Sequence, residues 1–280
     1  MYGAILGDII GQPYERHNLK SKTFPLFSVY ARFTDDSVMT VAVAEALLTA
    51  GSLGVINDEK RTKDIIIDCM HKWGHRYPHA GYGGRFYEWL RNCEREPYNS
   101  WGNGSAMRVS AAGWLYDEMD TTRKIARWTA EVTHDHPEGV KGAEAIASAI
   151  FMARNGSSKD DIKNYVETEF GYDLERTCDE IRPVYRFDVS CQGSVPEAII
   201  AFLEGTDFED TVRNAISLGG DSDTIGAMAG SIAEVFYGIP DALKAECDKR
   251  LPAEWHSIIE QLHGASSYKE NSACKHAGDL

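Results

Sequence analysis

The sequence has no C-x-x-C pair, no long apolar run and no excess of positive charge. Its six cysteines are scattered along the chain, which predicts reduced thiols in a cytoplasmic protein rather than a disulfide framework or a zinc site. No stretch approaches the roughly 18 apolar residues of a membrane-spanning helix. The first apolar stretch is short, carries Asp8 and lacks a basic leader, so we expect no signal peptide.

Basic residues are few relative to acidic ones. The chain has 29 lysines and arginines against 43 aspartates and glutamates, a formal net charge of −14. Nucleic acids and anionic membranes are bound through concentrated lysine and arginine, so both are disfavoured as partners. The same charge is compatible with a small phosphate ligand and leaves room for bound cations.

What the sequence does contain is one helical pattern after another. Only 182–190 looks strand-like, and it is too isolated to build a sheet, so we predict one compact all-α domain over residues 1–263, followed by a polar, flexible tail over 264–280. The long connections are expected at 16–33 and 74–104. Helical spacing of apolar residues is found at 2–12, 36–50, 61–73, 105–116, 122–132, 138–154, 159–169, 195–204, 208–217, 223–237, 241–248 and 253–263.

Residues at the ends of several segments predict where these helices begin and end. Thr121 and Ser158 are candidate caps at helix starts. Helix ends are predicted at Gly51, Gly156, Gly205 and Gly238.

Two adjacent aspartates precede one of the most apolar predicted helices, in the segment FTDDSVMT (33–40). One cap residue suffices for a helix, and the charges of Asp35 and Asp36 repel each other. The following helix is apolar nearly all round, which predicts that it is buried. Carboxylates beside a core are costly unless a cation or several donors compensate them. The simpler interpretation is an N-cap and nothing more.

A second apolar helix begins in the same way, in LGGDSDTIGAMAG, where Gly219 and Gly220 let the backbone turn sharply. If the two helix starts face each other, their oxygen ligands converge in a set that suits Mg²⁺, Mn²⁺ or Ca²⁺ better than zinc. Four carboxylates exceed what one divalent ion needs for neutrality, which favours two ions about 4 Å apart. The candidate ligands are Thr34, Asp35, Asp36, Asp221, Asp223 and Thr224.

A glycine-rich turn in SWGNGSAMRVSAAGWL (100–115) runs into a predicted helix. Its backbone N–H groups and the helix N-terminus are suited to a phosphate group. The alternative is a tight turn with Ser105 as its cap. Arg108 could pair with a phosphate or equally with a surface carboxylate.

Small residues recur at every fourth position of the first helix, at Gly3, Gly7 and Gly11, which predicts close packing against a neighbouring helix. Glu15 follows once Pro13 has ended that helix; alone, it is more typical of a surface carboxylate.

Two histidines lie close together in THDHPEG (133–139). His134 and His136 lack a third ligand nearby, which argues against zinc. Thr133 or Asp135 is predicted to cap the helix that begins at Pro137, and His134 is left as a candidate ligand contact.

Together these segments resemble the ADP-ribosylglycohydrolase family, which includes dinitrogenase reductase-activating glycohydrolases and ADP-ribosyl-acceptor hydrolases. The resemblance runs through GAILGDIIGQPYE, FTDDSVMT, GNGSAMRVS, THDHPEGVKGA, VPEAIIAFLEG and LGGDSDTIGAMAG, in that order. It implies a mostly helical fold with a binuclear magnesium or manganese centre, and hydrolysis of the bond between ADP-ribose and a modified side chain. Two departures are the continuation VSAAG, where proline is common, and Glu234, where many members carry glycine.

Carried across residue by residue, the resemblance assigns the six oxygen ligands above to the metals. Glu15, Asp35 and Asp36 become the candidate catalytic residues. The substrate-binding residues it implies are Ser100, Trp101, Gly102, Asn103, Gly104 and His134.

The resemblance leaves the acceptor open: modified arginine, serine, a guanidine compound, another ADP-ribose derivative or a modified nucleobase. Three other functions remain in view. A two-metal phosphohydrolase would use the same oxygen ligands. A non-catalytic, crystallin-like or ADP-ribose-binding protein would share the fold, and a purely structural helical protein would need the clusters only as caps.

Overall fold

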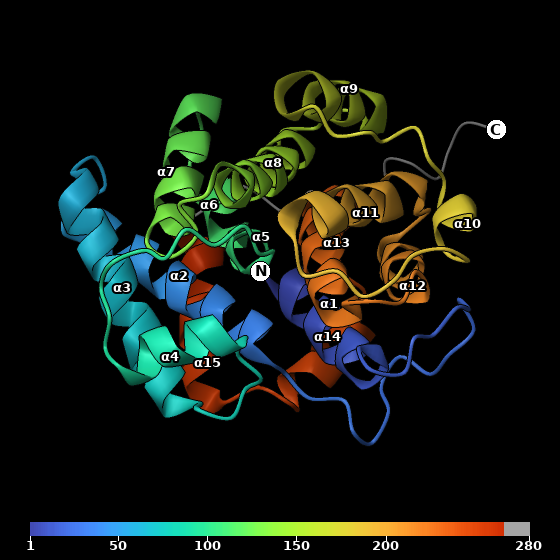
Figure 1. Cartoon of the computed structure of the whole chain (residues 1–280), viewed down its shortest axis with the longest axis horizontal. Helices are drawn as coiled ribbons and strands as arrows, with labels where there is room; N and C mark the ends of the chain where they lie inside the picture. The colour runs from blue at the N-terminus through green and yellow to red at the C-terminus, as the bar shows by residue number, and fades with distance from the viewer. Residues whose placement is uncertain (266–280) are drawn as a thin grey trace.

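The computed structural model describes residues 1–265, which form helices and loops without a β-sheet (Figure 1). The all-α prediction is therefore confirmed. The elements are α1 (Tyr2–Gly11), the 3₁₀ turn η1 (Gln12–Tyr14), α2 (Asp35–Ser52), α3 (Glu59–Arg76), α4 (Gly84–Arg91), α5 (Gly104–Met107), α6 (Ser110–Leu115), α7 (Met119–Glu131), α8 (Pro137–Arg154), α9 (Lys159–Phe170), α10 (Cys178–Ile181), α11 (Cys191–Glu204), α12 (Phe208–Ser217), α13 (Ser222–Tyr237), α14 (Asp241–Asp248) and α15 (Ala253–Ala265).

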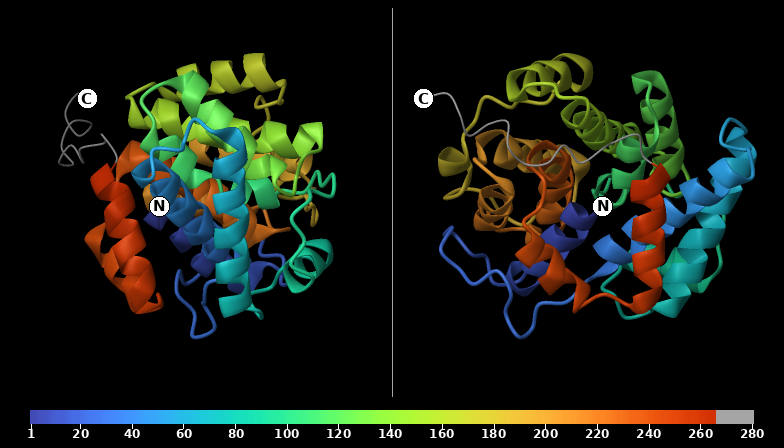
Figure 2. Two further views of the ribbon diagram at one scale, coloured as in Figure 1. Left: turned by 90° about the vertical axis from the view of Figure 1, so that its left-hand side faces the viewer. Right: turned by 180° about the vertical axis from the view of Figure 1, so that it is seen from behind.

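Helix α13 lies at the centre of the bundle. It packs against α1, α8, α11 and α12, and every residue from Ser222 to Val235 is buried. Helices α2, α3 and α4 form one flank, while α11 and α12 lie on the other (Figures 1 and 2). Such a helix is apolar all round because no face of it meets water. The nearly continuous apolar pattern of 223–237 follows from this position.

Helices α1 and α13 are in backbone contact through glycine. A Cβ placed on Gly7 would lie 2.0 Å from the carbonyl oxygen of Gly226, and one on Gly3 would lie 2.1 Å from that of Gly230. Gly11 approaches Asp223 in the same way. No side chain fits in these gaps, so the glycine spacing of the first helix sets how closely α1 can lie against α13.

Glu234 fastens the start of α1 to α13. Its carboxylate accepts hydrogen bonds from the backbone N–H groups of Tyr2 and Gly3 and pairs with the amine of Met1. Burial raises the pKa of Glu234, but the charges and hydrogen bonds of the Met1 amine and His263 together outweigh it and lower that pKa to about 2. The departure from glycine noted in the sequence thus has a packing role away from the acidic clusters.

Most predicted helices are present, with differences at their boundaries. The segment 105–116 is divided into α5 and α6 at Arg108 and Val109. Helices α4 and α10 were missed; α4 lies inside the predicted loop 74–104 and is only eight residues long. The strand-like segment 182–190 forms no strand, and its one ladder contact is an isolated bridge between Ser190 and Gly102.

Helix ends were predicted correctly where the capping residue interacts only with its near neighbours in sequence. Ser158 caps α9 in a full capping box, and Gly205 and Gly238 follow α11 and α13. Three predictions were wrong. Glu118, not Thr121, precedes α7, and Gly51 lies inside α2.

The third wrong prediction concerns the start of α8. Its cap is His136, which accepts a hydrogen bond from the N–H of Glu138, because Thr133 and Asp135 bond elsewhere: Asp135 accepts from the N–H of Asn99.

Helix α15 continues through Gly264 and Ala265, and the rest of the predicted tail lies outside the described residues. Within residues 1–265, no helix is both long and apolar enough to cross a membrane.

Candidate active site

A cleft of about 600 Å³ opens over the starts of α2 and α13. Trp101 alone among the predicted site residues does not line it; its side chain is 48% exposed, and its carbonyl oxygen accepts from the N–H of Cys191. The predicted residues that line the cleft are Glu15, Thr34, Asp35, Asp36, Ser100, Gly102, Asn103, Gly104, His134, Asp221, Asp223 and Thr224.

The first acidic cluster lies at the start of α2. Thr34 caps this helix, because its Oγ1 accepts from the N–H of Asp36 at 3.3 Å. The Oδ2 atom of Asp36 lies 3.3 Å from Thr34 Oγ1 and accepts from the hydroxyl of Thr224 at 3.2 Å, so the two helix starts do face each other. The buried Oδ1 of Asp36 has no hydrogen-bond partner among the described residues.

The second cluster is set by the turn before α13. Gly219 and Gly220 have φ values of +72° and +70°, which favour glycine at both positions. The side chain of Asn18 accepts from the N–H of Gly220 at 2.9 Å and holds this turn. Asp221 Oδ2 in turn accepts from Asn103 Nδ2 at 2.7 Å, which ties the cluster to the glycine-rich loop.

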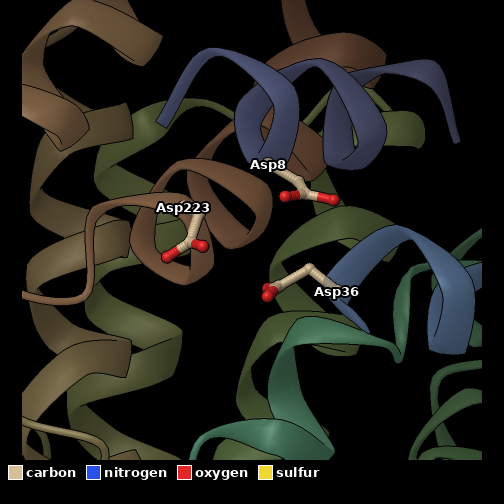
Figure 3. Close-up of side chains that lie close together, drawn as sticks. All are labelled: Asp8, Asp36 and Asp223. Atoms are coloured by element: carbon tan, nitrogen blue, oxygen red, sulfur yellow. The ribbon is translucent and has the colours of Figure 1, made fainter. Parts of the chain in front are cut away.

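A further buried carboxylate, Asp8 of α1, was missed as a site residue. Ligand atoms of Asp8, Asp36 and Asp223 all lie within 4.8 Å of one another, and the three side chains converge on one space from α1, α2 and α13 (Figure 3). Asp8 Oδ1 accepts from Thr34 Oγ1 at 2.8 Å, while Oδ2 accepts from the N–H of Thr34 and from the N–H and hydroxyl of Ser37.

Asp8 therefore holds Thr34 by both its backbone and its side chain. Asp35 and Asp221 line the cleft outside the group of three.

The acidic side chains disfavour one another's ionisation, as their raised pKa values indicate. Burial and the surrounding carboxylates raise the pKa of Asp35 to about 8, and they raise the pKa values of Asp36 and Asp223 well above the ordinary range. Burial also raises the pKa of Asp8 to about 6 against the effect of its hydrogen bonds. Within residues 1–265 no lysine or arginine forms an ion pair with any of these groups. Among the described residues, the negative charge of this cluster is therefore not balanced by a cationic side chain.

The glycine-rich loop lines the same cleft and contacts the acidic groups through Asn103. Asn103 N–H donates to the carbonyl of Val189 at 2.7 Å, and the loop leads into α5, which has only four residues. The predicted contribution of a long helix N-terminus is therefore absent at this loop.

Arg108 is not paired with a surface carboxylate. It is 1% exposed, and its Nη2 donates to Thr129 O and Thr133 Oγ1.

Glu15 stands at the edge of the cleft, just after η1. Its side chain is 26% exposed. Partial burial, and secondarily the charge of Asp221, raise its pKa. A carboxylate with a raised pKa at a cleft is suited to accept a proton from water during a reaction.

Comparison with known proteins decides the family. The model for ADP-ribosylglycohydrolase matches residues 1–271. The chain belongs to the ADP-ribosylglycohydrolase family. Among its relatives are the ADP-ribosylhydrolases ARH3 of Mus musculus and Homo sapiens. Each is 28% identical over 88% of this chain; the match covers 85% of the mouse protein and 87% of the human one.

A solved ADP-ribosylglycohydrolase-related protein complex shares the fold. Its TM-score is 0.65, with 24% identity over 95% of both chains. Membership makes this ADP-ribosylglycohydrolase a glycosidic-bond hydrolase.

Proposed function

We propose that this ADP-ribosylglycohydrolase is a divalent-cation-dependent hydrolase that releases ADP-ribose from a modified side chain or small molecule. One observation carries the cation dependence: Asp8, Asp36 and Asp223 are buried together without a compensating cationic side chain, and Asp36 Oδ1 lacks any partner among residues 1–265.

The residues present fit a hard cation. Carboxylates and threonine hydroxyls are ligands that Mg²⁺ and Mn²⁺ accept, and no cysteine or histidine belongs to the set. The charge of the carboxylates around the cleft exceeds that of one divalent ion, which supports two. Thr34, Asp35, Asp36, Asp221, Asp223 and Thr224 would hold them. When bound, such ions lower the pKa of water and orient substrate oxygens.

The chain's own groups supply the rest of the reaction. Cleavage at the anomeric carbon of ribose develops positive charge on the ring, as in other glycoside hydrolysis, and the acidic floor of the cleft favours that charge. The carboxylate of Glu15 would orient the attacking water and take its proton. The loop residues Ser100, Gly102, Asn103 and Gly104 would hold the diphosphate. Trp101 would contact the substrate from the rim of the cleft.

The free cysteines bear on the compartment, and the proposed substrate contacts bear on the class of acceptor. The five described cysteines are free thiols, which supports a reducing, cytoplasmic setting. Because all the proposed substrate contacts are with the ADP-ribose half, the acceptor is proposed as a class only: a modified protein side chain such as arginine or serine, or a small guanidine derivative.

The test is product release from ADP-ribosylarginine and ADP-ribosylserine with and without Mg²⁺ or Mn²⁺. We expect cation-dependent release of intact ADP-ribose. Asp223→Asn should remove turnover while the circular dichroism spectrum stays that of the parent chain. Ser52→Ala, at the far end of α2, is the matched control and should retain full activity.

Other products would point elsewhere. Release of phosphate or a nucleoside monophosphate would indicate a phosphohydrolase instead. Binding of ADP-ribose without turnover of either substrate, in both cations, would favour a non-catalytic binding protein.

A further inference from the structure

The two ring nitrogens of His134 face different surroundings, the buried core on one side and the glycine-rich loop of the cleft on the other. It is 5% exposed, and its Nδ1 lies 2.7 Å from Thr133 Oγ1, on the buried side. Its Nε2 faces the glycine-rich loop, because a Cβ on Gly104 would lie 3.1 Å from this atom and one on Gly102 3.5 Å. His134 also lines the cleft. The ring therefore connects the core to the proposed diphosphate site.

Arg108 decides the direction of the hydrogen bonds behind this ring. A guanidinium only donates, so Thr133 Oγ1 is the acceptor in its 2.7 Å contact with Arg108 Nη2. A hydroxyl has one hydrogen to give, and among the described residues the remaining partner of Thr133 Oγ1 is His134 Nδ1. If Thr133 donates to Nδ1, its hydroxyl hydrogen has an acceptor and Nδ1 carries no proton; a protonated Nδ1 would leave that hydrogen without an acceptor among the described residues.

We propose that the hydrogen-bond chain Arg108–Thr133–His134 fixes His134 as the neutral tautomer that carries its proton on Nε2. Arg108 and Thr133 are positioning residues, and His134 presents a single donor to the cleft. Neutrality agrees with the surroundings, since burial and then the charge of Arg108 lower the pKa of His134 well below its ordinary value.

The consequence is a selection among ligand groups. A fixed N–H at this wall donates to a phosphate or ribose oxygen and disfavours a ligand group that is itself only a donor. The expectation that the ligand is ADP-ribose rests on the proposed function, whereas the tautomer is a property of the free protein. The two claims can therefore fail separately.

The test is long-range ¹H–¹⁵N correlation spectroscopy on protein labelled at its histidines, with His134 assigned by the His134→Gln spectrum. The proposal expects a protonated Nε2 and an unprotonated Nδ1 at pH 7. Thr133→Val, which keeps the shape but removes the hydroxyl, should turn this into a mixture of tautomers. Thr133→Ser should restore the parent pattern.

Calorimetry with ADP-ribose gives the functional readout. Thr133→Val should weaken binding roughly tenfold, the loss of about one hydrogen bond, while Thr133→Ser binds as the parent does. An Nδ1-protonated ring in the parent protein would overturn the proposal even if the valine variant does not fold. So would a valine variant with an unchanged tautomer. Failure of the parent to bind ADP-ribose, with the Nε2 tautomer observed, would support the hydrogen-bond chain and refute the proposed function.

Discussion

Replacing Asp8 by asparagine changes one atom of a buried side chain and should separate stability from cation binding. The amide oxygen can take the place of Oδ2 and keep the bonds from the N–H groups of Thr34 and Ser37. The NH₂ group then faces Thr34 Oγ1, which must accept from it. Since Thr34 Oγ1 already accepts from the N–H of Asp36, no lone pair is left for a cation.

The expected effect of Asp8→Asn on stability differs with and without the cation. Without it, the variant loses one of three carboxyl groups whose ligand atoms lie within 4.8 Å of one another. Two unit charges at that distance repel by about 3.5 kcal/mol at an effective dielectric constant of about 20, so the Tm of the variant should be unchanged or higher. With it, loss of an outer partner of a metal ligand lowers cation affinity about 10- to 100-fold. This equals about 1.4 to 2.7 kcal/mol, so the rise in Tm at saturating cation should shrink by about 3 to 10 °C.

The assay is a thermal scan of the chelated protein, repeated with excess Mn²⁺ and with Mg²⁺. Ser37→Ala is the matched control, because it removes a hydroxyl that donates to Asp8 and leaves Thr34 untouched. Its cation-dependent rise in Tm should stay close to that of the parent. Two results would refute the reasoning: an Asp8→Asn variant with parental cation affinity, or one whose Tm falls equally in the presence and absence of the ion.

Three further predictions concern packing, pH and the rim of the cleft. Gly7→Ala should destabilise the fold by several kcal/mol, on the order of an overpacked core position, because its Cβ would lie 2.0 Å from a backbone oxygen of α13. Gly51→Ala, inside α2 with open space around it, should instead stabilise by about 0.5–1 kcal/mol; urea unfolding of both variants checks the pair. His134 has a lowered folded pKa, so the unfolded chain binds a proton that the fold refuses, and stability is lost as pH falls below about 6.5. His134→Gln should flatten the stability curve between pH 6.5 and 5 by up to about 1.4 kcal/mol per pH unit, and equal slopes in both proteins would contradict this. Trp101→Ala should leave Tm nearly unchanged, since the side chain is 48% exposed, but weaken ADP-ribose binding about 5- to 150-fold if the ring stacks on the base; equal affinity in calorimetry would remove Trp101 from the site.

Sequence patterns predicted the helical class and the two facing acidic clusters because both depend on short-range chemistry. Helical periodicity and local caps such as Ser158 are properties of a few neighbouring residues. The doubled clusters at Asp35–Asp36 and Asp221–Asp223 were conspicuous because each exceeds what a cap requires. Helix α4 was missed because its eight residues give too few turns for a clear helical period.

Roles that depend on distant contacts were not predicted. Asp8 was noticed only as an acid in an apolar stretch, although a charge on the buried face of a glycine-striped helix is itself a signal that a partner must exist. Its partners Thr34 and Ser37 come from another helix start. For Arg108, pairing with a surface carboxylate was one of the two expectations and was wrong, while contact with a phosphate stays a prediction, since Arg108 lines the cleft. Nothing near it in sequence indicates that its Nη2 would donate to Thr129 and Thr133.

The glycine contact between α1 and α13 has a consequence for the order of events during synthesis. The first helix contributes Asp8 and the thirteenth contributes Asp223, so the acidic group of three cannot assemble until nearly the whole chain has left the ribosome. At typical elongation rates the two helices emerge about 10 to 40 s apart. During that interval the glycine face of α1 has no partner, and completion of α13 is the step that both closes the bundle and creates the site.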